Sequence, residues 1–280
     1  MIQDIYPHFI NNQFVANVTP GGNAYLIHFR ENNVLIKSGV EGDFLAQIKD
    51  LSVEPEMSSC TYLFSLNNVP CFLYQADFEL NNDALDYRDI GFFRTTTNKE
   101  TAWATLIAWH LFKWYSEHKF CGTCGAPTLH KADERAVQCN KCNSVYYPKI
   151  SPAVIVAVLN EDKLLLANNA NFRSGWFSLI AGYTDVGETL EETVRREVKE
   201  EVGLDVGNIR YYKSQPWALS GSLMIGFIAE VLDKTQPIQT DGHEITNAEW
   251  FSADNLPEHP TAEISIAGEM IELFKNGKLI

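Results

Sequence analysis

Residues 182–204 read GYTDVGETLEETVRREVKEEVGL, and this stretch decides the fold of the second half of the chain. Thr189 is followed three residues later by Glu192, which is the spacing of a capping box at the start of a helix. Gly203 stands where a helix would end in the left-handed conformation. The sequence therefore predicts a helix with defined ends over residues 190–202.

The predicted helix has one apolar and one acidic face. Its apolar residues recur every four positions and form a stripe: Leu190, Val194, Val198 and Val202. Glu197, Glu200 and Glu201 lie on an adjoining arc, where neighbouring carboxylates repel by a few tenths of a kcal/mol per pair, about 0.2 to 0.5. A solvated acidic surface is one interpretation of this face. The other is a site for Mg²⁺ or Mn²⁺, because these cations prefer oxygen ligands and would replace the repulsion with coordination.

The residues around the glutamates favour the metal site, because they resemble the Nudix box. That box has the pattern G-x5-E-x7-R-E-U-x-E-E-x-G-U, in which U is aliphatic. The chain matches every defined position: Gly182, Glu188, Arg196, Glu197, Val198, Glu200, Glu201, Gly203 and Leu204. The resemblance implies a Nudix α/β/α sandwich that hydrolyses a nucleoside diphosphate linked to another moiety. It also implies that Glu197, Glu200 and Glu201 bind divalent cations, while Glu188 and Arg196 hold the loop and the helix together.

Hydrolysis of a diphosphate needs cations and a general base. The substrate's own negative charge repels hydroxide, and bound cations neutralise that charge and lower the pKa of an attacking water. Glu201 is one candidate for the base. Glu244 is another candidate, as the base or as a further ligand of the Mg²⁺ or Mn²⁺ cations, because it precedes a predicted strand at residues 248–251, where members of the resembled family often place an extra carboxylate. A solvated loop glutamate is the alternative interpretation of Glu244.

Upstream of the box, four cysteines form two Cys-x-x-Cys pairs separated by 14 residues: Cys121, Cys124, Cys139 and Cys142. Two such pairs can surround Zn²⁺ tetrahedrally and leave no position for water, so we expect a structural zinc site. Two disulfides are the alternative, although nothing in the sequence indicates secretion. A nucleic-acid-binding ribbon is a further possibility, but Lys141 and a few neighbours make only a thin basic patch. Cys60 and Cys71 lie singly in apolar segments and are expected to be buried thiols.

These motifs divide the chain into three domains of an α+β multidomain protein. We expect a small α+β domain over residues 1–117, a zinc ribbon over 118–150 and the Nudix domain over 151–280. In the first domain the patterns predict strands at 24–29, 33–36, 61–66 and 70–74, and helices at 41–51 and 98–119. In the last they predict a hairpin of 153–159 with 163–167, strands at 176–180, 209–214, 223–231 and 248–251, and a second helix at 262–276.

The order of the parts is similar to that in the NADH pyrophosphatase branch of the Nudix family. YYPKISP at residues 146–152 leads into the Nudix domain, and SQPWALSGS at 214–222 partly matches the branch signature SQPWPFPxS. The resemblance implies that NADH or NAD⁺ is cleaved into nicotinamide mononucleotide and AMP, that an NAD cap is removed from RNA, and that the enzyme is a homodimer. It places these residues at the substrate: Tyr147, Tyr183, Gln215, Trp217, Ser222 and Ala267. As isolated aromatic residues, Tyr183 and Trp217 would more often belong to the core.

Other functions stay open at the level of sequence. The missing Pro-Phe-Pro core leaves the choice of dinucleotide in doubt, so a hydrolase of ADP-ribose or diadenosine polyphosphates is an alternative, as is a nucleotide sensor without turnover. The chain has 22 Lys plus Arg against 36 Asp plus Glu, a formal charge of −14, which disfavours nonspecific binding to nucleic acid or to an anionic membrane. We find no secretory signal and no apolar run long enough to span a bilayer, and expect a cytoplasmic protein.

Overall fold

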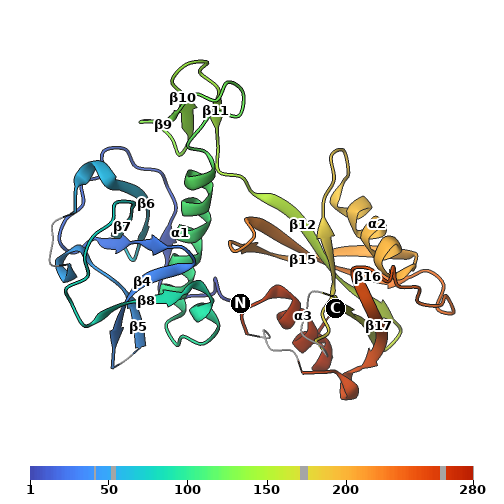
Figure 1. Cartoon of the computed structure of the whole chain (residues 1–280). Coiled ribbons are helices and arrows are strands. Elements are labelled where there is room, and N and C mark those ends of the chain that lie inside the picture. Colours follow the sequence, from blue (N-terminus) through green and yellow to red (C-terminus); the bar gives the residue numbers. More distant parts are fainter. Residues whose placement is uncertain (41, 52–54, 171–175, 259–262, 280) are drawn as a thin grey trace. The chain divides into compact units, whose positions relative to one another are not determined.

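The computed structural model describes all residues except 41, 52–54, 171–175, 259–262 and 280, and it divides into two compact units (Figure 1). The first, here called the N-terminal unit, holds residues 2–149 and 218–220. The second, the C-terminal unit, holds Met1 and residues 150–217 and 221–280. The boundary between residues 149 and 150 lies next to the predicted start of the Nudix domain, whereas the division at 117/118 stays a prediction.

The N-terminal unit contains two small sheets and a long helix. One sheet has the order β1 (Ile10–Asn11), β6 (Cys60–Leu66), β7 (Val69–Tyr74) and β2 (Tyr25–Ile27). In the other, β4 (Asn33–Gly39) pairs with β3 (Phe29–Arg30), β5 (Gly42–Leu45) and β8 (Leu85–Asp89). Helix α1 (Lys99–Glu117) buries four aromatic residues, Trp103, Trp109, Trp114 and Tyr115. The rings of Trp109 and Phe112 lie against the ring of Phe29, so these aromatic residues are part of the core of this unit.

The predicted helix at 41–51 is wrong. Residues 42–45 form β5, which pairs with β4, and only Ile48–Asp50 make a short 3₁₀ turn; residue 41 lies outside the described part. Gly42 has φ of 124°, a conformation that side chains disfavour and that closes the hairpin opposite Gly39. The turn glycine thus overrides the helical spacing of the apolar residues.

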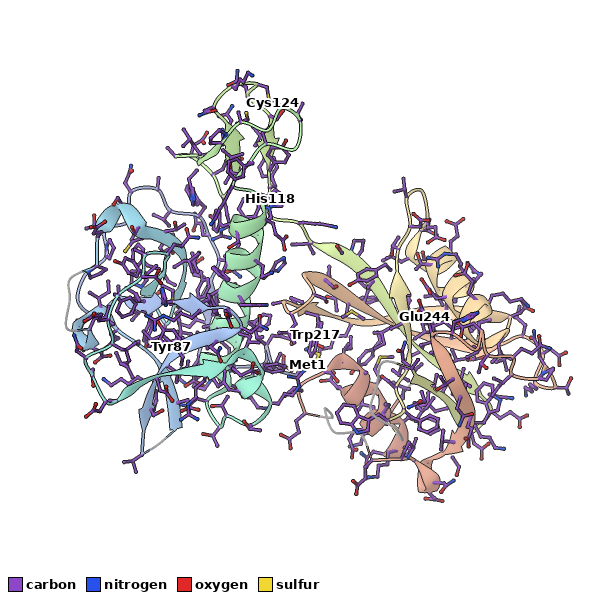
Figure 2. The ribbon with its side chains drawn as sticks, in the orientation of Figure 1. Met1, Tyr87, His118, Cys124, Trp217 and Glu244 are labelled. Carbon is purple, nitrogen blue, oxygen red and sulfur yellow. The ribbon has the colours of Figure 1, made fainter. Side chains whose placement is uncertain are left out.

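After α1 the chain forms a three-stranded antiparallel ribbon. Its strand order is β11 (Val145–Tyr146), β10 (Val137–Cys139) and β9 (Thr128–His130). Cys121, Cys124 and Cys142 lie outside these strands, Cys139 is the last residue of β10, and Figure 2 labels Cys124 at the tip of the ribbon.

The C-terminal unit is built on one six-stranded mixed sheet. Its order is β15 (Val206–Trp217), β16 (Ser222–Val231), β12 (Ser151–Asn160), β13 (Lys163–Asn169) and β17 (Ile245–Ser252), with β14 (Ile180–Tyr183) paired to β12. Strands β12 and β13 form the predicted hairpin. The strand predicted at 176–180 lies later in the chain, because only Ser178 makes a bridge before β14 begins.

Two helices cover opposite faces of this sheet. Alternate residues of β12 point to opposite sides, so Val154, Val156 and Val158 pack in one core with the apolar stripe of α2 (Leu190–Val202). Ile155 and Ala157 pack in the other core, with α3 (Ile266–Lys275). This confirms the predicted α/β/α sandwich. No helix in the described residues is long and apolar enough to cross a membrane.

Candidate active site and zinc centre

Helix α2 begins and ends where the sequence predicts. The hydroxyl of Thr189 accepts a hydrogen bond from the amide of Glu192, and the Glu192 carboxylate accepts one from the amide of Thr189 at 2.8 Å. Gly203 ends the helix with φ of 73°. These caps fix the rotation of the helix and therefore the direction in which its glutamates project.

Arg196 connects the helix to the loop before it. Its Nε and Nη2 atoms donate to the two carboxylate oxygens of Glu188 at 2.5 and 2.8 Å, and Nη2 also donates to the carbonyl of Tyr183 at 2.9 Å. Hydrogen bonds from Arg196 are the main reason that the pKa of Glu188 falls to about 2. This bidentate pair gives Glu188 and Arg196 a bracing role between β14, the loop and α2.

The same guanidinium contacts two of the predicted metal ligands. Nη1 of Arg196 lies 2.8 Å from Oε1 of Glu197 and 3.2 Å from Oε2 of Glu200. Glu197 is buried against the backbone of Gly182, where a Cβ atom would overlap its carboxylate. The first glycine of the box is therefore needed to make room for a box glutamate.

Glu201 is the most unusual carboxylate of the site. Its side chain is buried, and among the described residues its Oε2 has no hydrogen-bond partner. Burial is the main cause that raises its pKa to about 8, and the nearby charges of Glu197 and Glu244 add to the effect. A buried, unpartnered acceptor beside other carboxylates is costly unless a cation binds there.

Glu244, labelled in Figure 2, lies in the loop that leads into β17, as the sequence predicts. The loop is shaped by Asp241, whose carboxylate accepts hydrogen bonds from the amides of His243, Glu244 and Ile245. Sequence reasoning missed Asp241, although an Asp-Gly pair before a glutamate is a turn signal.

The donor set fits a hard divalent cation, because the groups around Glu201 are carboxylate oxygens. These carboxylate oxygens do not all lie close enough together to form a complete set of ligands around one cation. Among the described residues, only the four cysteines have ligand atoms that all lie within 4.8 Å of one another. Glu197 and Glu200 face Arg196 instead, so a cation would compete with this arginine for their oxygens.

The predicted substrate residues of the C-terminal unit come from neighbouring strands. Trp217 of β15 is directly opposite Ser222 of β16. The hydroxyl groups of Ser222 and of Tyr183, on β14, share a hydrogen bond at 3.1 Å. Tyr183 is more than half exposed, whereas Trp217 is half-buried. The structure thus brings Tyr183 and Ser222 together at one end of the sheet.

Gln215 and Ala267 meet at the start of α3. Gln215 is fully buried, and its amide donates to the carbonyl of Ile264 at 2.9 Å and accepts from the amide of Ile266 at 2.7 Å. Ser265 caps the helix by accepting from Gly268, and its carbonyl accepts from Glu269. Within the described part of the chain, the amide of Ala267 has no hydrogen-bond partner. That amide can therefore bind a ligand, whereas the Gln215 side chain holds the helix start.

Tyr147 belongs to the N-terminal unit. Its hydroxyl donates to Oε1 of Glu134 at 3.1 Å, and its ring is 58% exposed. An exposed ring can stack on a planar base, so its role at the substrate stays a prediction.

The four cysteines form the expected cluster. All are free thiols, and the Sγ atoms of Cys121 and Cys142, and of Cys124 and Cys139, are 3.5 Å apart. This separation is too long for a disulfide and is close to the edge of a zinc tetrathiolate tetrahedron, about 3.8 Å for Zn–S bonds of about 2.3 Å.

Hydrogen-bond donors surround the sulfur atoms. The amides of Thr123, Lys141 and Cys142 donate to Sγ atoms at 3.4 Å. The Tyr146 hydroxyl lies 3.2 Å from Sγ of Cys121, and sequence reasoning missed this contact. Such donors stabilise thiolate charge, so the cluster fits a structural Zn²⁺ with no open position.

Comparisons with known proteins agree with this geometry. Residues 149–274 match the NUDIX domain, and residues 116–147 match the NADH pyrophosphatase zinc ribbon domain. The NAD-capped RNA hydrolase NudC of Stutzerimonas stutzeri is 36% identical over 251 residues, which cover 89% of this chain and 88% of that protein. The protein of the same name from Salmonella typhimurium is 40% identical over 186 residues, covering 66% of this chain and 71% of its own. A NUDIX hydrolase structure from Nitrosomonas europaea is 23% identical with a TM-score of 0.49, covering 56% of this chain and 91% of that one.

Proposed function

This chain belongs to the Nudix hydrolases, in the branch that carries the NADH pyrophosphatase zinc ribbon, and from that premise we propose that it hydrolyses the diphosphate of NADH and NAD⁺. Water adds to one phosphorus, the bridging P–O bond breaks, and the bridging oxygen leaves with the other phosphate. The products are nicotinamide mononucleotide and AMP. Mg²⁺ or Mn²⁺ is the catalytic cation, and Zn²⁺ is the structural one.

The observation that carries the proposal is the buried Glu201, with its unpartnered Oε2, in a cluster with Glu197 and Glu244. A sensor that only binds a nucleotide has no need for such a costly group. Divalent cations bound there would neutralise the diphosphate and lower the pKa of the attacking water.

The protein's own groups have separate roles in the proposed reaction. Glu197, Glu200 and Glu201 supply oxygen ligands, and Arg196 and Glu188 hold the helix against the loop. Glu244, or Glu201 itself, takes the proton from water. Because Glu244 is exposed and lies in a loop, it can release that proton to solvent.

We assign recognition of the dinucleotide to the end of the C-terminal unit's sheet at which Tyr183 and Ser222 lie. We place a planar base against the exposed ring of Tyr183, and a polar group of the substrate at the amide of Ala267, for which the described residues offer no partner. Trp217 and Ser222 complete this surface. Gln215 acts indirectly, because its side chain holds the backbone of Ile264 and Ile266 at the start of α3. The exposed ring of Tyr147, in the N-terminal unit, is a separate candidate for stacking on a base.

The same bond occurs at the 5′ end of an NAD-capped RNA. The relative from Stutzerimonas stutzeri is named an NAD-capped RNA hydrolase, which supports extension of the proposal to this substrate. Cleavage would release nicotinamide mononucleotide and leave an RNA with a 5′ monophosphate. Only the end of the RNA needs to enter the site, so the formal charge of −14 is no obstacle to it.

The altered signature favours a second candidate. Ala218, Leu219 and Ser220 replace Pro-Phe-Pro, which removes two rigid residues and one aromatic ring. Weaker discrimination by this segment would admit ADP-ribose or diadenosine polyphosphates.

One experiment ranks these substrates. The protein is incubated with NADH, NAD⁺, ADP-ribose, diadenosine tetraphosphate and NAD-capped RNA, with Mg²⁺ or Mn²⁺, and the products are identified by mass spectrometry. The proposal expects the highest kcat/KM on a nicotinamide dinucleotide or on the capped RNA. Preference for ADP-ribose would support the second candidate, and no turnover on any substrate would support a sensor.

We also propose that the protein is a homodimer in the cytoplasm. Light scattering of the protein as it elutes from a size-exclusion column compares its mass with the 31.6 kDa of one chain.

A further inference from the structure

We propose that Asp241 is a positioning residue: its carboxylate holds the loop that carries Glu244, so that Glu244 faces Glu201. This inference rests on the proposed hydrolytic function and deepens it, because it names the group that aligns two carboxylates from separate elements. Asp241 acts through Glu244 and touches neither the cation nor the substrate.

The hydrogen bonds of the Asp241 carboxylate all come from amides of its own loop. Oδ1 accepts from the amides of His243 at 3.0 Å and Ile245 at 2.9 Å, and Oδ2 accepts from the amide of Glu244 at 3.2 Å. Gly242 takes φ of 71°, which lets the chain fold back over the carboxylate. Three consecutive amides thus converge on one side chain, and both of its oxygens are occupied.

The loop is also fastened at each end by backbone hydrogen bonds. On one side the amide of Asp241 donates to the carbonyl of Glu201 at 3.3 Å, and the amide of Gln239 donates to the carbonyl of Val202 at 2.9 Å. On the other side the carbonyl of Glu244 accepts from the amide of Ala170 at 2.8 Å. These bonds attach the loop to the last turn of α2 and to the end of β13. Asp241 fixes the residues in between.

The position of Glu244 matters because its loop is attached beside Glu201. The amide of Asp241 donates to the carbonyl of Glu201 at 3.3 Å, and Glu244 follows three residues later in the chain. Because it projects from a loop and not from a helix, its direction depends on the turn beneath it.

Aspartate suits this turn better than asparagine does. A carboxylate offers acceptors on both oxygens, whereas the amide of asparagine replaces one acceptor with an NH₂ donor. In an Asp241→Asn variant that donor would face the amide of Glu244. The turn would keep two of its bonds, lose the third and release Glu244 from a single orientation.

A double-mutant cycle tests this role. The variants are Asp241→Asn, Glu244→Gln and the double variant. Asp233→Asn is the matched control, because Asp233 also caps a turn, accepting from the amide of Thr235 at 2.9 Å. We expect Asp241→Asn to lower kcat by about 10- to 100-fold with KM for NADH nearly unchanged. In the Glu244→Gln background the same change should have no further effect, and Asp233→Asn should match the wild type.

Binding of Mn²⁺, followed by electron paramagnetic resonance without substrate, is the second readout. Loss of a positioning group commonly weakens metal affinity by about 10- to 100-fold, so we expect Asp241→Asn and Glu244→Gln to weaken Mn²⁺ binding to a similar extent. If Asp241→Asn does not fold, Asp241→Ser replaces it in the cycle, because a serine hydroxyl can accept from the same turn.

Two results would overturn the inference. One is an independent effect, in which the losses from Asp241→Asn and Glu244→Gln multiply in the double variant. The other is wild-type kcat and Mn²⁺ affinity in Asp241→Asn. If the wild type hydrolyses no dinucleotide, the proposed function fails, but the Mn²⁺ cycle still decides whether Asp241 acts through Glu244.

Discussion

Glu201 combines burial, an Oε2 atom without a hydrogen-bond partner in the described part of the chain, and four acidic neighbours, and this combination favours a bound cation. Sequence spacing placed Glu201 on the acidic face of α2, but it could not show the burial. Burial depends on neighbours that are distant in sequence. The turn made by Asp241 is local, but its attachment to the site is not, because the amide of Asp241 donates to the carbonyl of Glu201 on α2.

Replacement of Glu201 by glutamine should abolish most activity without unfolding the protein. The variant removes the charge and keeps the shape, so we expect kcat to fall by about 100-fold or more, because cation-dependent neutralisation of the diphosphate is lost. Thermal unfolding should be unchanged or slightly improved, since burial already disfavours the charged form of Glu201 and glutamine carries no charge. Near-normal turnover would contradict the assignment of Glu201 to the metal site.

Gly182 gives a prediction about packing. An alanine there would overlap the carboxylate of Glu197, so Gly182→Ala should destabilise the protein by about 1 to 3 kcal/mol, the usual cost of overpacking. Activity should fall as well, because Glu197 must move. Urea unfolding and kcat measure the two effects, and Gly21→Ala is the control for adding a methyl group where no atom lies within 4 Å. Equal stability of Gly182→Ala and the wild type would show that Glu197 is free to shift.

The sequence predicted elements whose ends are marked by nearby residues, such as α2. It did not predict elements whose conformation depends on pairing with a strand elsewhere in the chain, such as β5. Helix α2 was predicted at its observed ends because its capping box and terminal glycine are encoded within 15 residues, from Thr189 to Gly203. The segment at 41–51 has helical spacing, but pairing with β4 makes part of it a strand. The role of Gln215 also required the structure, because its partners at residues 264 and 266 lie about 50 positions away, at sequence separations of 49 and 51.

The ion pair between Glu188, in the loop before α2, and Arg196, on α2, predicts a pH dependence of the free energy of unfolding. The pKa of Glu188 falls from its ordinary 4.5 to about 2 in the folded protein, chiefly through hydrogen bonds from Arg196. A carboxylate with a lowered folded pKa stabilises the fold above its unfolded pKa, and this stabilisation is lost as the pH falls through the folded value. We therefore expect Glu188→Gln to be less stable than the wild type at neutral pH, with the difference shrinking between pH 4.5 and 2.

Denaturant unfolding across that range measures the effect of Glu188→Gln. Glu191→Gln, in the first turn of the same helix, removes an equal charge outside the Arg196 contacts seen in the described residues and should show no such trend. A stability difference for Glu188→Gln that stays constant down to pH 2 would contradict the bracing role.

At the scale of the whole molecule, the chain pairs a catalytic sandwich with a unit whose ribbon is held by a metal. The ribbon has only three short strands, so it cannot bury a sizeable apolar core by itself. The cysteine cluster was predicted from spacing, because Cys-x-x-Cys pairs encode its geometry locally. The assignment of the glutamates of α2 to a metal site stays a prediction. The sequence could not give the tyrosine that supports Cys121.

Loss of the zinc site should affect folding before it affects chemistry. Structural zinc contributes on the order of 10 kcal/mol to folding of small domains, so Cys139→Ser should lose bound zinc and destabilise the ribbon. Cys71→Ser is the control, because Cys71 is buried in the N-terminal unit away from the cluster. Elemental analysis and thermal unfolding measure the result. A fully stable Cys139→Ser protein without zinc would refute the structural role.

The central claim is that the carboxylates of α2 direct water to the diphosphate of a nicotinamide dinucleotide. Hydrolysis of NAD⁺ in ¹⁸O-water, with the products weighed by mass spectrometry, tests it most directly. The wild type should give nicotinamide mononucleotide and AMP with one ¹⁸O in one of the two phosphates, and Glu201→Gln should give almost none of either. Release of nicotinamide and ADP-ribose, or no cleavage of the diphosphate by the wild type, would contradict the claim.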